Sequence, residues 1–318
     1  MMQRPALAPG WAAHHAEPPL TDLAILYEHP SWFAPLFAAL DRRGIDYQPL
    51  TTAGHFDPSA PPPARLIFNR IAMSAFLRDA QHPIFWAQAL LAHWQRANAR
   101  VINGTAALAI DTSKANQLSL IASLGLAVPA TRVIHRAEDA EAAAEAIGYP
   151  LLLKANIGGA GAGIVRFDSR EQLRAGIVDG TLPTSIDNVL LVQEFVPARG
   201  GTITRVETLD RAYLYAIEVS GAGQFDLCPA DACVAGSGIT MTAVEPDERL
   251  RRASEAIATA ASLDVGGVEF LIDDRDGRAL FYDINALSNF VARPLDVLGW
   301  DPHERLVDRL VGWIKESR

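Results

Sequence analysis

The chain has 318 residues, with 28 basic and 37 acidic side chains and a formal net charge of −9. Nearly half of it is apolar (49%) and only 20% is charged, a composition that excludes an intrinsically disordered chain. The acidic balance argues against nucleic-acid binding, which needs clustered Lys and Arg. The sequence contains no charge-free apolar window of about 18 residues, so we expect no membrane span. We expect a folded protein of two or three packed units.

The cellular compartment follows from the N-terminus and the cysteines. The polar, Pro-rich start, residues 1–19, has no apolar stretch typical of a secretory signal. Cys228 and Cys233 cannot form a disulfide framework, so we expect a cytoplasmic protein with reduced thiols that are structural or line a substrate site. A redox or metal role is the alternative, but two thiolates fall short of four zinc ligands.

In chain order, a tail (1–20) precedes an N-terminal α/β domain (21–103). Strands alternating with helices predict a small parallel sheet there. The expected strands cover 23–27, 45–50, 65–68 and 100–102, and the expected helices cover 32–40 and 83–94.

A central subdomain (104–185) and a C-terminal subdomain (186–318) follow. In the central one, Asp111 or Thr112 is expected to cap a helix that ends at Gly125. Its other expected elements are a helix at 138–147 and a hairpin over 151–167. The C-terminal subdomain is predicted to hold strands at 189–195, 202–209, 213–219, 268–272 and 280–284, and helices at 247–262 and 302–314.

A glycine-rich segment, 158–163, follows Lys154 by four residues. It is neither a Walker loop, because no Gly-Lys-Ser/Thr follows, nor a dinucleotide fingerprint, because a strand follows where a helix should. Such a segment lets backbone N–H groups approach an anion closely, and a lysine beside it adds a positive charge. The alternative is a flexible hairpin in solvent.

Three polar side chains lie on two neighbouring predicted strands near the C-terminus. Asp283 and Asn285 are two residues apart and therefore share one strand face, and Glu269 can face the same side. Two carboxylates and an amide oxygen are hard ligands that suit Mg²⁺. The alternative is a polar, solvated sheet face.

The third motif is the run Gln193, Glu194, Phe195 and Val196 at the end of an apolar strand. Its backbone could meet the edge of an adenine and the Glu194 carboxylate could meet the amino group. Taken alone, the run is only the usual end of an edge strand.

Together, these motifs occur in the order typical of the ATP-grasp superfamily, and the chain resembles that superfamily over residues 103–294. Residues 103–131 and the segment around Arg70 (68–71) are similar to the RimK-like glutamate ligases, a carboxylate–amine ligase branch. The resemblance implies an α/β (α+β) ATP-grasp fold. It comprises a small parallel-sheet pre-ATP-grasp domain, a central α+β lid subdomain and a C-terminal antiparallel-sheet subdomain with a metal site.

The resemblance also assigns roles to residues. It implies that the catalytic residues are Arg205, which stabilises the transferred phosphoryl group, and Lys154, which contacts the nucleotide phosphates. ATP is contacted by Lys114, Lys154, Gly158, Gly159, Gly161, Gly163, Gln193, Glu194, Phe195 and Val196. One or two Mg²⁺ ions, which Mn²⁺ could replace, are bound by Glu269, Asp283 and Asn285.

Two arginines, Arg70 and Arg293, are the candidates for substrate binding. A planar guanidinium grips a carboxylate through two hydrogen bonds, which favours Arg70 for the acid substrate. The alternative for Arg70 is a surface salt bridge.

The implied activity is ATP-dependent ligation of a carboxylate to an amine through an acyl phosphate, on an amino acid or peptide. We expect small-molecule or peptide substrates, no nucleic acid or membrane partner, and a homo-dimer or homo-tetramer. A small-molecule kinase of the same fold is the first alternative, although residues 219–248 lack the Lys and Arg that a phosphorylated substrate needs. A non-catalytic ATP-binding regulator is the second.

Three departures from the branch limit what the resemblance carries. Asp283 stands where most of the branch has Glu, and residues 221–233 lack a basic residue found in relatives. Residues 286–293 replace a small Pro-Gly turn. Nucleotide binding tolerates these changes, but substrate identity does not transfer.

Overall fold

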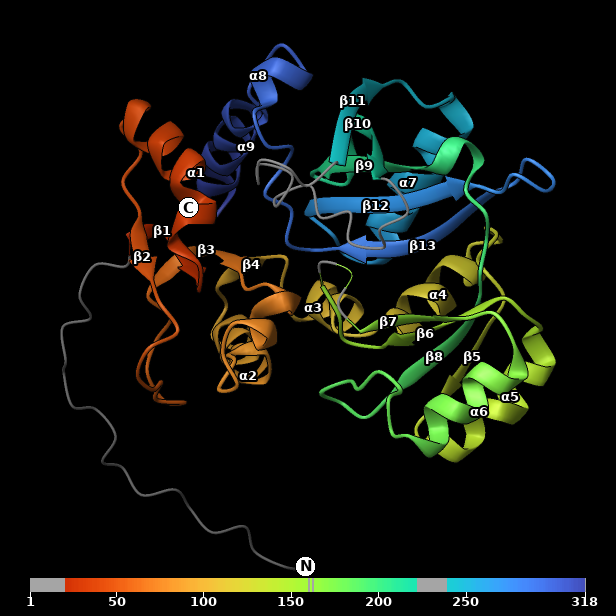
Figure 1. The fold of residues 1–318 in the computed structure, drawn as a ribbon. Coiled ribbons are helices and arrows are strands. Elements are labelled where there is room, and N and C mark those ends of the chain that lie inside the picture. The colour runs from red at the N-terminus through yellow and green to blue at the C-terminus, as the bar shows by residue number, and fades with distance from the viewer. Residues whose placement is uncertain (1–20, 160, 162, 222–238, 318) are drawn as a thin grey trace, which may run out of the picture.

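The computed structural model describes residues 21–159, 161, 163–221 and 239–317. Figure 1 shows this part of the chain arranged around three sheets, with the N-terminal sheet beside the central and C-terminal ones. The predicted tail, Cys228 and Cys233 lie outside the described residues. Within those residues, no helix has both the length and the apolar character that crossing a membrane requires.

Seven elements form the N-terminal unit: β1 (Thr21–Tyr27), α1 (Pro30–Arg42), β2 (Gln48–Leu50), β3 (Ala64–Arg70), the 3₁₀ turn η1 (Met73–Leu77), α2 (Ile84–Arg96) and β4 (Arg100–Ile102). The sheet order is β2-β1-β3-β4, and all pairs are parallel, as predicted. Alternate strand residues face opposite sides. Leu23 and Ile25 pack with α1, and Ala24 and Leu26 pack with α2.

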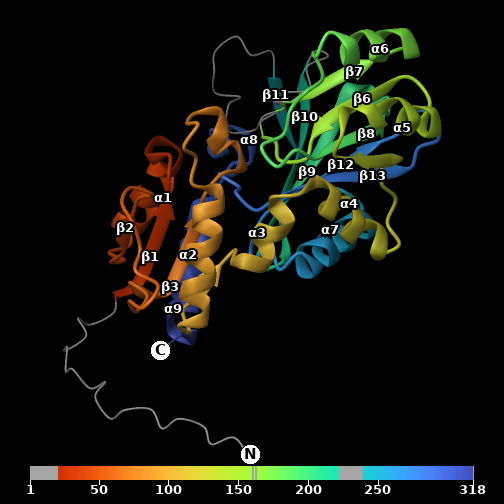
Figure 2. The same ribbon diagram turned by 90° about the horizontal axis from the view of Figure 1, so that it is seen from below.

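The last helix of the chain, α9 (Pro302–Glu316), packs against α1 and β3 (Figure 2). Leu306, Leu310 and Trp313 recur at helical spacing and are at most 2% exposed. Their buried cluster includes Leu23 and also Tyr215 from the C-terminal sheet. The chain therefore returns to the N-terminal unit at its end, although the sequence grouped this helix with the C-terminal subdomain.

The central unit contains α3 (Thr105–Asp111), α4 (Lys114–Ser123), β5 (Thr131–Ile134), η2 (Ala137–Asp139), α5 (Ala140–Ile147), β6 (Leu151–Ala155), β7 (Ile164–Phe167), α6 (Arg170–Val178) and β8 (Leu190–Glu194). Its antiparallel sheet has the order β5-β8-β6-β7. Strand β8 belongs to it because Val192 pairs with Leu153 of β6. The sequence had grouped this strand with the C-terminal subdomain.

Helix α4 begins after Ser113, not after Asp111 or Thr112 as predicted. The Ser113 hydroxyl accepts a hydrogen bond from the Asn116 backbone N–H at 3.2 Å and so caps the helix. Asp111 instead ends α3, and its Oδ1 accepts the Ala286 N–H at 3.1 Å. The predicted cap was wrong because two short helices meet here where one was expected.

The C-terminal unit contains η3 (Arg199–Gly201), β9 (Thr202–Leu209), β10 (Ala212–Gly221), β11 (Ile239–Val244), α7 (Glu248–Ala260), β12 (Val265–Ile272), β13 (Ala279–Asn285) and α8 (Pro294–Val297). Its antiparallel sheet has the order β11-β10-β9-β12-β13, with α7 packed on one face. Strands β5 and β11 and helix α6 were not predicted. Each is short and largely exposed, so its apolar period is weak.

Asn103 joins the N-terminal unit to the C-terminal sheet. Its Oδ1 accepts the N–H groups of Asp264 (2.9 Å) and Val265 (3.1 Å). Its Nδ2 donates to the carbonyls of Val265 and Ala286. Because the side chain is 1% exposed and its φ is +50°, this left-handed, fully bonded asparagine fixes the start of β12 and the end of β13 together.

Candidate active site

The three predicted metal ligands come together on the paired strands β12 and β13. Glu269 and Asp283 are direct cross-strand partners. Asn285 Nδ2 donates to Glu269 Oε1 at 3.2 Å and to Asp283 Oδ2 at 3.3 Å. The three side chains therefore face one space.

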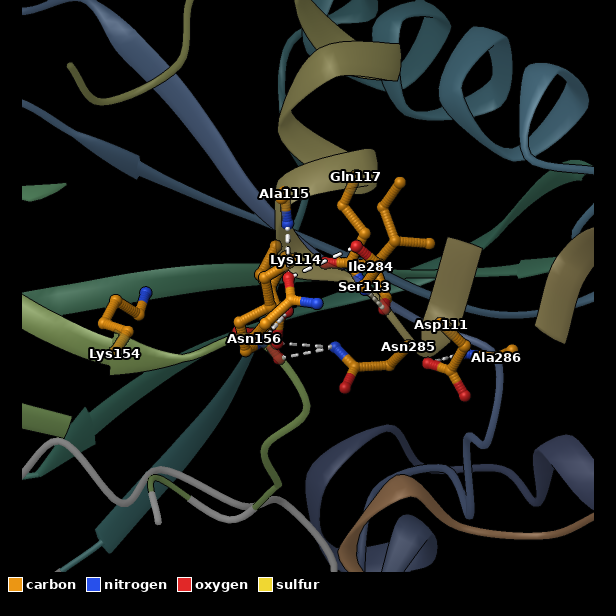
Figure 3. A network of polar contacts seen from close by, with 12 residues as sticks. Asp111, Ser113, Lys114, Ala115, Gln117, Lys154, Asn156, Ile284, Asn285 and Ala286 are labelled. Atoms are coloured by element: carbon orange, nitrogen blue, oxygen red, sulfur yellow. Dashed lines mark hydrogen bonds and ion pairs between the residues drawn. The ribbon is translucent and has the colours of Figure 1, made fainter. Parts of the chain in front are cut away.

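Lys114 completes this cluster from the start of α4, and its Nζ donates to Asp283 Oδ1. Asn156 fixes the backbone there, because its Oδ1 accepts from the Ala115 N–H (2.9 Å) and the Ser113 hydroxyl (3.2 Å). Figure 3 shows Asn156 against Lys114, with Asn285 reaching toward them and Lys154 standing apart on the other side. Sequence reasoning missed Asn156, whose signal is a polar residue directly after a buried strand.

Gln117 is a second positioning residue that the sequence did not single out. It is 1% exposed, its Nε2 donates to the Ile284 carbonyl (2.9 Å) and its Oε1 accepts the Ile284 N–H (3.1 Å). These two hydrogen bonds hold α4 against β13 at Ile284, the residue between Asp283 and Asn285. A buried Gln on an otherwise apolar helix face was the available signal.

Arg205 enters the cluster from β9, where it lies directly opposite Glu269. Its Nη1 donates to Glu269 Oε1 at 3.1 Å and its Nε to Glu207 Oε1 at 2.6 Å. Gly267 leaves room for it, since a Cβ at that position would lie 2.7 Å from Arg205 Nε. The second glycine of the pair at the start of β12 therefore makes room for the guanidinium, whereas a Cβ on the first, Gly266, would meet the Asn285 carbonyl at 2.4 Å.

Burial and opposing charges set the protonation of this cluster. Burial, followed by the Asp283 carboxylate, raises the pKa of Glu269. Burial alone would lower the pKa of Lys114, but the carboxylates of Asp283, Glu269 and Asp111 together outweigh it and the pKa is raised. Burial, together with the nearby Lys114, lowers the pKa of Lys154 to about 8. Burial raises the pKa of Asp111, beside the cluster, to about 7.

A central cavity of about 80 Å³ is lined by Lys114, Arg205, Asp283 and Asn285. Gly158 and Gly159 line it from the glycine-rich segment, and Trp32, Ser74, Asn289 and Phe290 line it from elsewhere. A Cβ on Gly159 would lie 2.6 Å from the Ser74 Cβ, so glycine is required for this approach. Gly161 and Gly163 have φ of +72° and +73°, a conformation that favours glycine.

A second cavity of about 450 Å³, here called the hinge cavity, lies between β6, β8 and the C-terminal sheet. Its lining includes the predicted residues Lys154, Gln193, Glu194, Phe195 and Val196. Lys154 Nζ donates to Gln193 Oε1 at 3.2 Å and lies 5.5 Å from the centre of the Tyr282 ring.

The Glu194 carboxylate already has partners at the edge of the hinge cavity. Its Oε1 accepts the Ala130 N–H at 2.8 Å, and its Oε2 accepts from Arg275 Nη2 at 2.9 Å. Glu194 thus links the end of β8 to Ala130 and to the β12–β13 turn, and it also lines the hinge cavity.

The two substrate arginines lie in different surroundings. Arg70 is 2% exposed, packs over the rings of Phe33 and Phe68, and donates from Nη2 to the Ser288 carbonyl. The surface salt bridge considered for it is therefore wrong. Its Nε and Nη1 are buried without a hydrogen-bond partner among the described residues. Arg293 is exposed (74% of the side chain), and its Nη1 lies 3.8 Å from Asp296 Oδ2.

The donor set suits a hard divalent cation. Within the described residues, no cluster of three or more His, Cys, Asp and Glu side chains forms a metal site, so the candidate set is two carboxylates and one amide. The adjacent carboxylates repel each other, and after burial this repulsion is the second cause of the raised pKa of Glu269. A cation between them would relieve that repulsion, and rotation of the Asn285 amide would turn its oxygen toward the same space.

Comparisons with known proteins agree on the fold. Residues 111–293 match the model of the RimK-like ATP-grasp domain. A "Probable alpha-L-glutamate ligase" of Mannheimia succiniciproducens is 30% identical over 215 residues, which cover 65% of this chain and 68% of the relative. A solved structure of the ATP-grasp ligase PsnB, complexed with a phosphomimetic variant of its minimal precursor, Mg and ADP, superposes with a TM-score of 0.68. It shares 17% identity, and the alignment covers 92% of this chain and 99% of that one.

Other relatives are matched over less of their length. A "Probable alpha-L-glutamate ligase" of Aliivibrio salmonicida is 24% identical over 193 residues, 60% of this chain and 61% of the relative. The chain thus spans less than two thirds of that protein. The ligands and substrates named for these proteins are those of the relatives themselves.

Proposed function

This chain belongs to the RimK-like ATP-grasp family, and from that premise we propose that it is an ATP-dependent ligase that joins a carboxylate to an amine. One observation carries the proposal: Lys114, Arg205, Asp283 and Asn285 surround one small cavity. Phosphoryl transfer requires fixed positive charges, which Lys114 and Arg205 supply, and oxygen ligands for a metal ion, which Asp283 and Asn285 supply.

The nucleotide is assigned to the hinge cavity, with adenine against the backbone of Phe195 and Val196. Lys154 lines this cavity and Lys114 lines the central one, so the phosphates would run from the first lysine toward the second. Gly158 and Gly159 would cover them with backbone alone, which supplies N–H groups and excludes water.

Glu269, Asp283 and Asn285 would hold Mg²⁺. When bound, the ion would neutralise charge on the β- and γ-phosphates. One or two ions, replaceable by Mn²⁺, remain part of this proposal. The chain itself supplies Arg205, held against Glu269 and Glu207, as a fixed cation beside the central cavity.

The reaction would have two steps. A substrate carboxylate oxygen attacks the γ-phosphorus, the bond to the bridging oxygen breaks, and ADP leaves with an acyl phosphate remaining. The amine nitrogen then attacks the acyl carbon, phosphate leaves and the amine proton passes to solvent. Arg205 would stabilise the negative charge on the phosphoryl group in both steps, because it is positioned before the substrate arrives.

The test is ATP turnover with Mg²⁺ against a panel of amino acids and short peptides, with ADP, AMP and phosphate read separately. ADP and phosphate released only with a particular acid–amine pair would support the ligase and identify its substrates. ADP without free phosphate would indicate a kinase. Tight ATP binding without turnover by any pair would favour the non-catalytic regulator.

The proposed assembly is a homo-dimer or homo-tetramer. Sedimentation velocity on the full chain would check it, and a single species at 34.3 kDa would exclude both.

A further inference from the structure

A groove of about 540 Å³ lies beside the central cavity and is unused by the chemistry above. We call it the Trp32 groove. It lies between the start of α1, the segment 289–296 and the start of α9, and its lining includes Trp32, Pro35, Phe290 and Leu295. Because Trp32, Asn289 and Phe290 line both spaces, the groove is continuous with the central cavity.

The walls of the groove are held rigidly. Trp32 is stacked on His29 (ring centres 4.5 Å apart) and covered by the Arg78 guanidinium at 4.6 Å. Phe290 is 3% exposed and packs edge-on against His303 at 5.3 Å. A ring fixed on each side is a feature of apolar binding sites.

The backbone of the groove segment is strained. Phe290 and Arg293 have φ of +58° and +50°, values that bulky side chains rarely adopt. Val291 N–H donates to the Tyr215 hydroxyl at 2.9 Å, and Arg70 holds the Ser288 carbonyl, so contacts on both sides maintain the strain. This is the segment that replaces the expected Pro-Gly turn.

The rim of the groove is exposed, apolar and slightly acidic. Leu295 is 68% exposed, one of few large apolar side chains so exposed among the described residues. Asp296 lies 3.8 Å from Arg293, and Asp301 lies 4.0 Å from Arg42, which pairs more closely with a third carboxylate, Glu304, at 2.6 Å. His303 adds no fixed charge, since burial lowers its pKa and favours the neutral form. The remaining negative charge favours a cationic ligand over an anionic one.

We propose that the Trp32 groove binds the amine substrate and takes an amino acid or peptide amine with an apolar or aromatic side chain. This assignment rests on the proposed function. The ammonium group would enter along the acidic rim, the side chain would lie between Trp32 and Leu295, and the nitrogen would reach the central cavity past Asn289. Trp32 and Leu295 then act as specificity-determining residues that touch no reacting atom.

The experiment measures binding separately from turnover. The full chain, saturated with ADP and Mg²⁺, is titrated calorimetrically with L-phenylalaninamide and with glycinamide. We expect phenylalaninamide to bind at least tenfold more tightly, and both Leu295→Ala and Trp32→Ala to reduce that preference severalfold. Leu77→Ala, which removes the same side chain at another exposed site (49%) that does not line the groove, is the matched control and should keep the preference.

Equal binding of the two amides, no binding of either, or a preference unchanged in both groove variants would overturn the assignment. Circular dichroism spectra matching the wild type would exclude misfolding of Trp32→Ala, and Leu295→Ala changes an exposed side chain only. Failure of the ligase proposal is distinguishable: no acid–amine pair would release ADP while the amide preference persists.

Discussion

The hinge cavity and the Trp32 groove lie on two sides of the same reaction centre but are built differently. Lys154 and Gln193 of the hinge cavity are fixed by register on paired strands, as are Glu269 and Asp283 of the proposed metal site. The groove is assembled from a helix start near residue 32 and a strained segment near residue 290 that are far apart in the sequence. Strand register restricts what can change on the nucleotide side, whereas loops leave the substrate side free to differ between relatives.

The largest effect is expected on the nucleotide side from Asp283→Asn. The variant keeps the size of the side chain but removes the charge that faces Lys114 and the proposed metal. We expect Mg²⁺-dependent ATP turnover to fall by about 10²–10³-fold, the usual loss for one fixed electrostatic contact. Steady-state ADP release measures it.

The matched control is Asp308→Asn, which removes an exposed carboxylate paired with Arg43. It should leave turnover within about twofold of the wild type, because surface ion pairs contribute little. Comparable losses in both variants would mean that the Asp283 effect is one of general charge and not of position.

Gly267→Ala tests the contribution of backbone space on the same side. The added Cβ would lie 2.7 Å from Arg205 Nε, so the guanidinium must move away from Glu269. Misplacement by about 1 Å can cost about 10²-fold in rate, and we expect a fall in kcat of that order with little change in ATP affinity. Gly312→Ala is the control, since its nearest neighbour is the movable end of Arg309. An unchanged kcat in Gly267→Ala would remove Arg205 from the catalytic role.

The contrast between the two sides also explains what the sequence could predict. Glu269, Asp283 and Asn285 were placed on one face because the period of a strand is two, and the structure brings them together. Asn156 and Gln117 were missed because their hydrogen-bond partners come from segments that are distant in the sequence and meet them only in the tertiary fold. No local pattern announces such partners.

The Trp32 groove could not be predicted from the sequence for a related reason. The sequence showed that residues 286–293 depart from the family pattern. It did not show that Trp32 lines the same groove, because that arrangement depends on how α9 returns to the N-terminal unit. The surroundings of Arg70 were hidden in the same way: no local pattern indicated that its guanidinium would be buried over Phe33 and Phe68.

Arg70→Met tests the substrate side through a buried cation. Its Nε and Nη1 have no partner among the described residues, which is costly unless a ligand supplies one. We expect the KM of the acid substrate to rise about tenfold, equivalent to roughly 1.4 kcal/mol, and the KM of ATP to stay constant. Because Met keeps the packing on Phe33 and Phe68, the thermal midpoint should change little. Arg70→Lys keeps the charge but not the planar geometry and should recover only part of the affinity. An unchanged acid KM in Arg70→Met would discard the assignment.

The smallest effect is expected from the protonation of Lys154 on the hinge side. In the free protein, burial lowers its pKa to about 8, so the ammonium loses its proton as the pH rises through that value. Bound phosphates favour the charged form and raise this pKa, so ATP binding should take up a proton above pH 8. The Kd for ATP should therefore rise with pH above 8, by at most about tenfold per pH unit.

Calorimetric titration with ATP at pH 8.5, in two buffers of different ionisation enthalpy, measures the uptake directly. Lys154→Arg, which stays charged, should bind without it. Proton uptake that persists in this variant would assign the titration to another group and leave Lys154 with a contact role only.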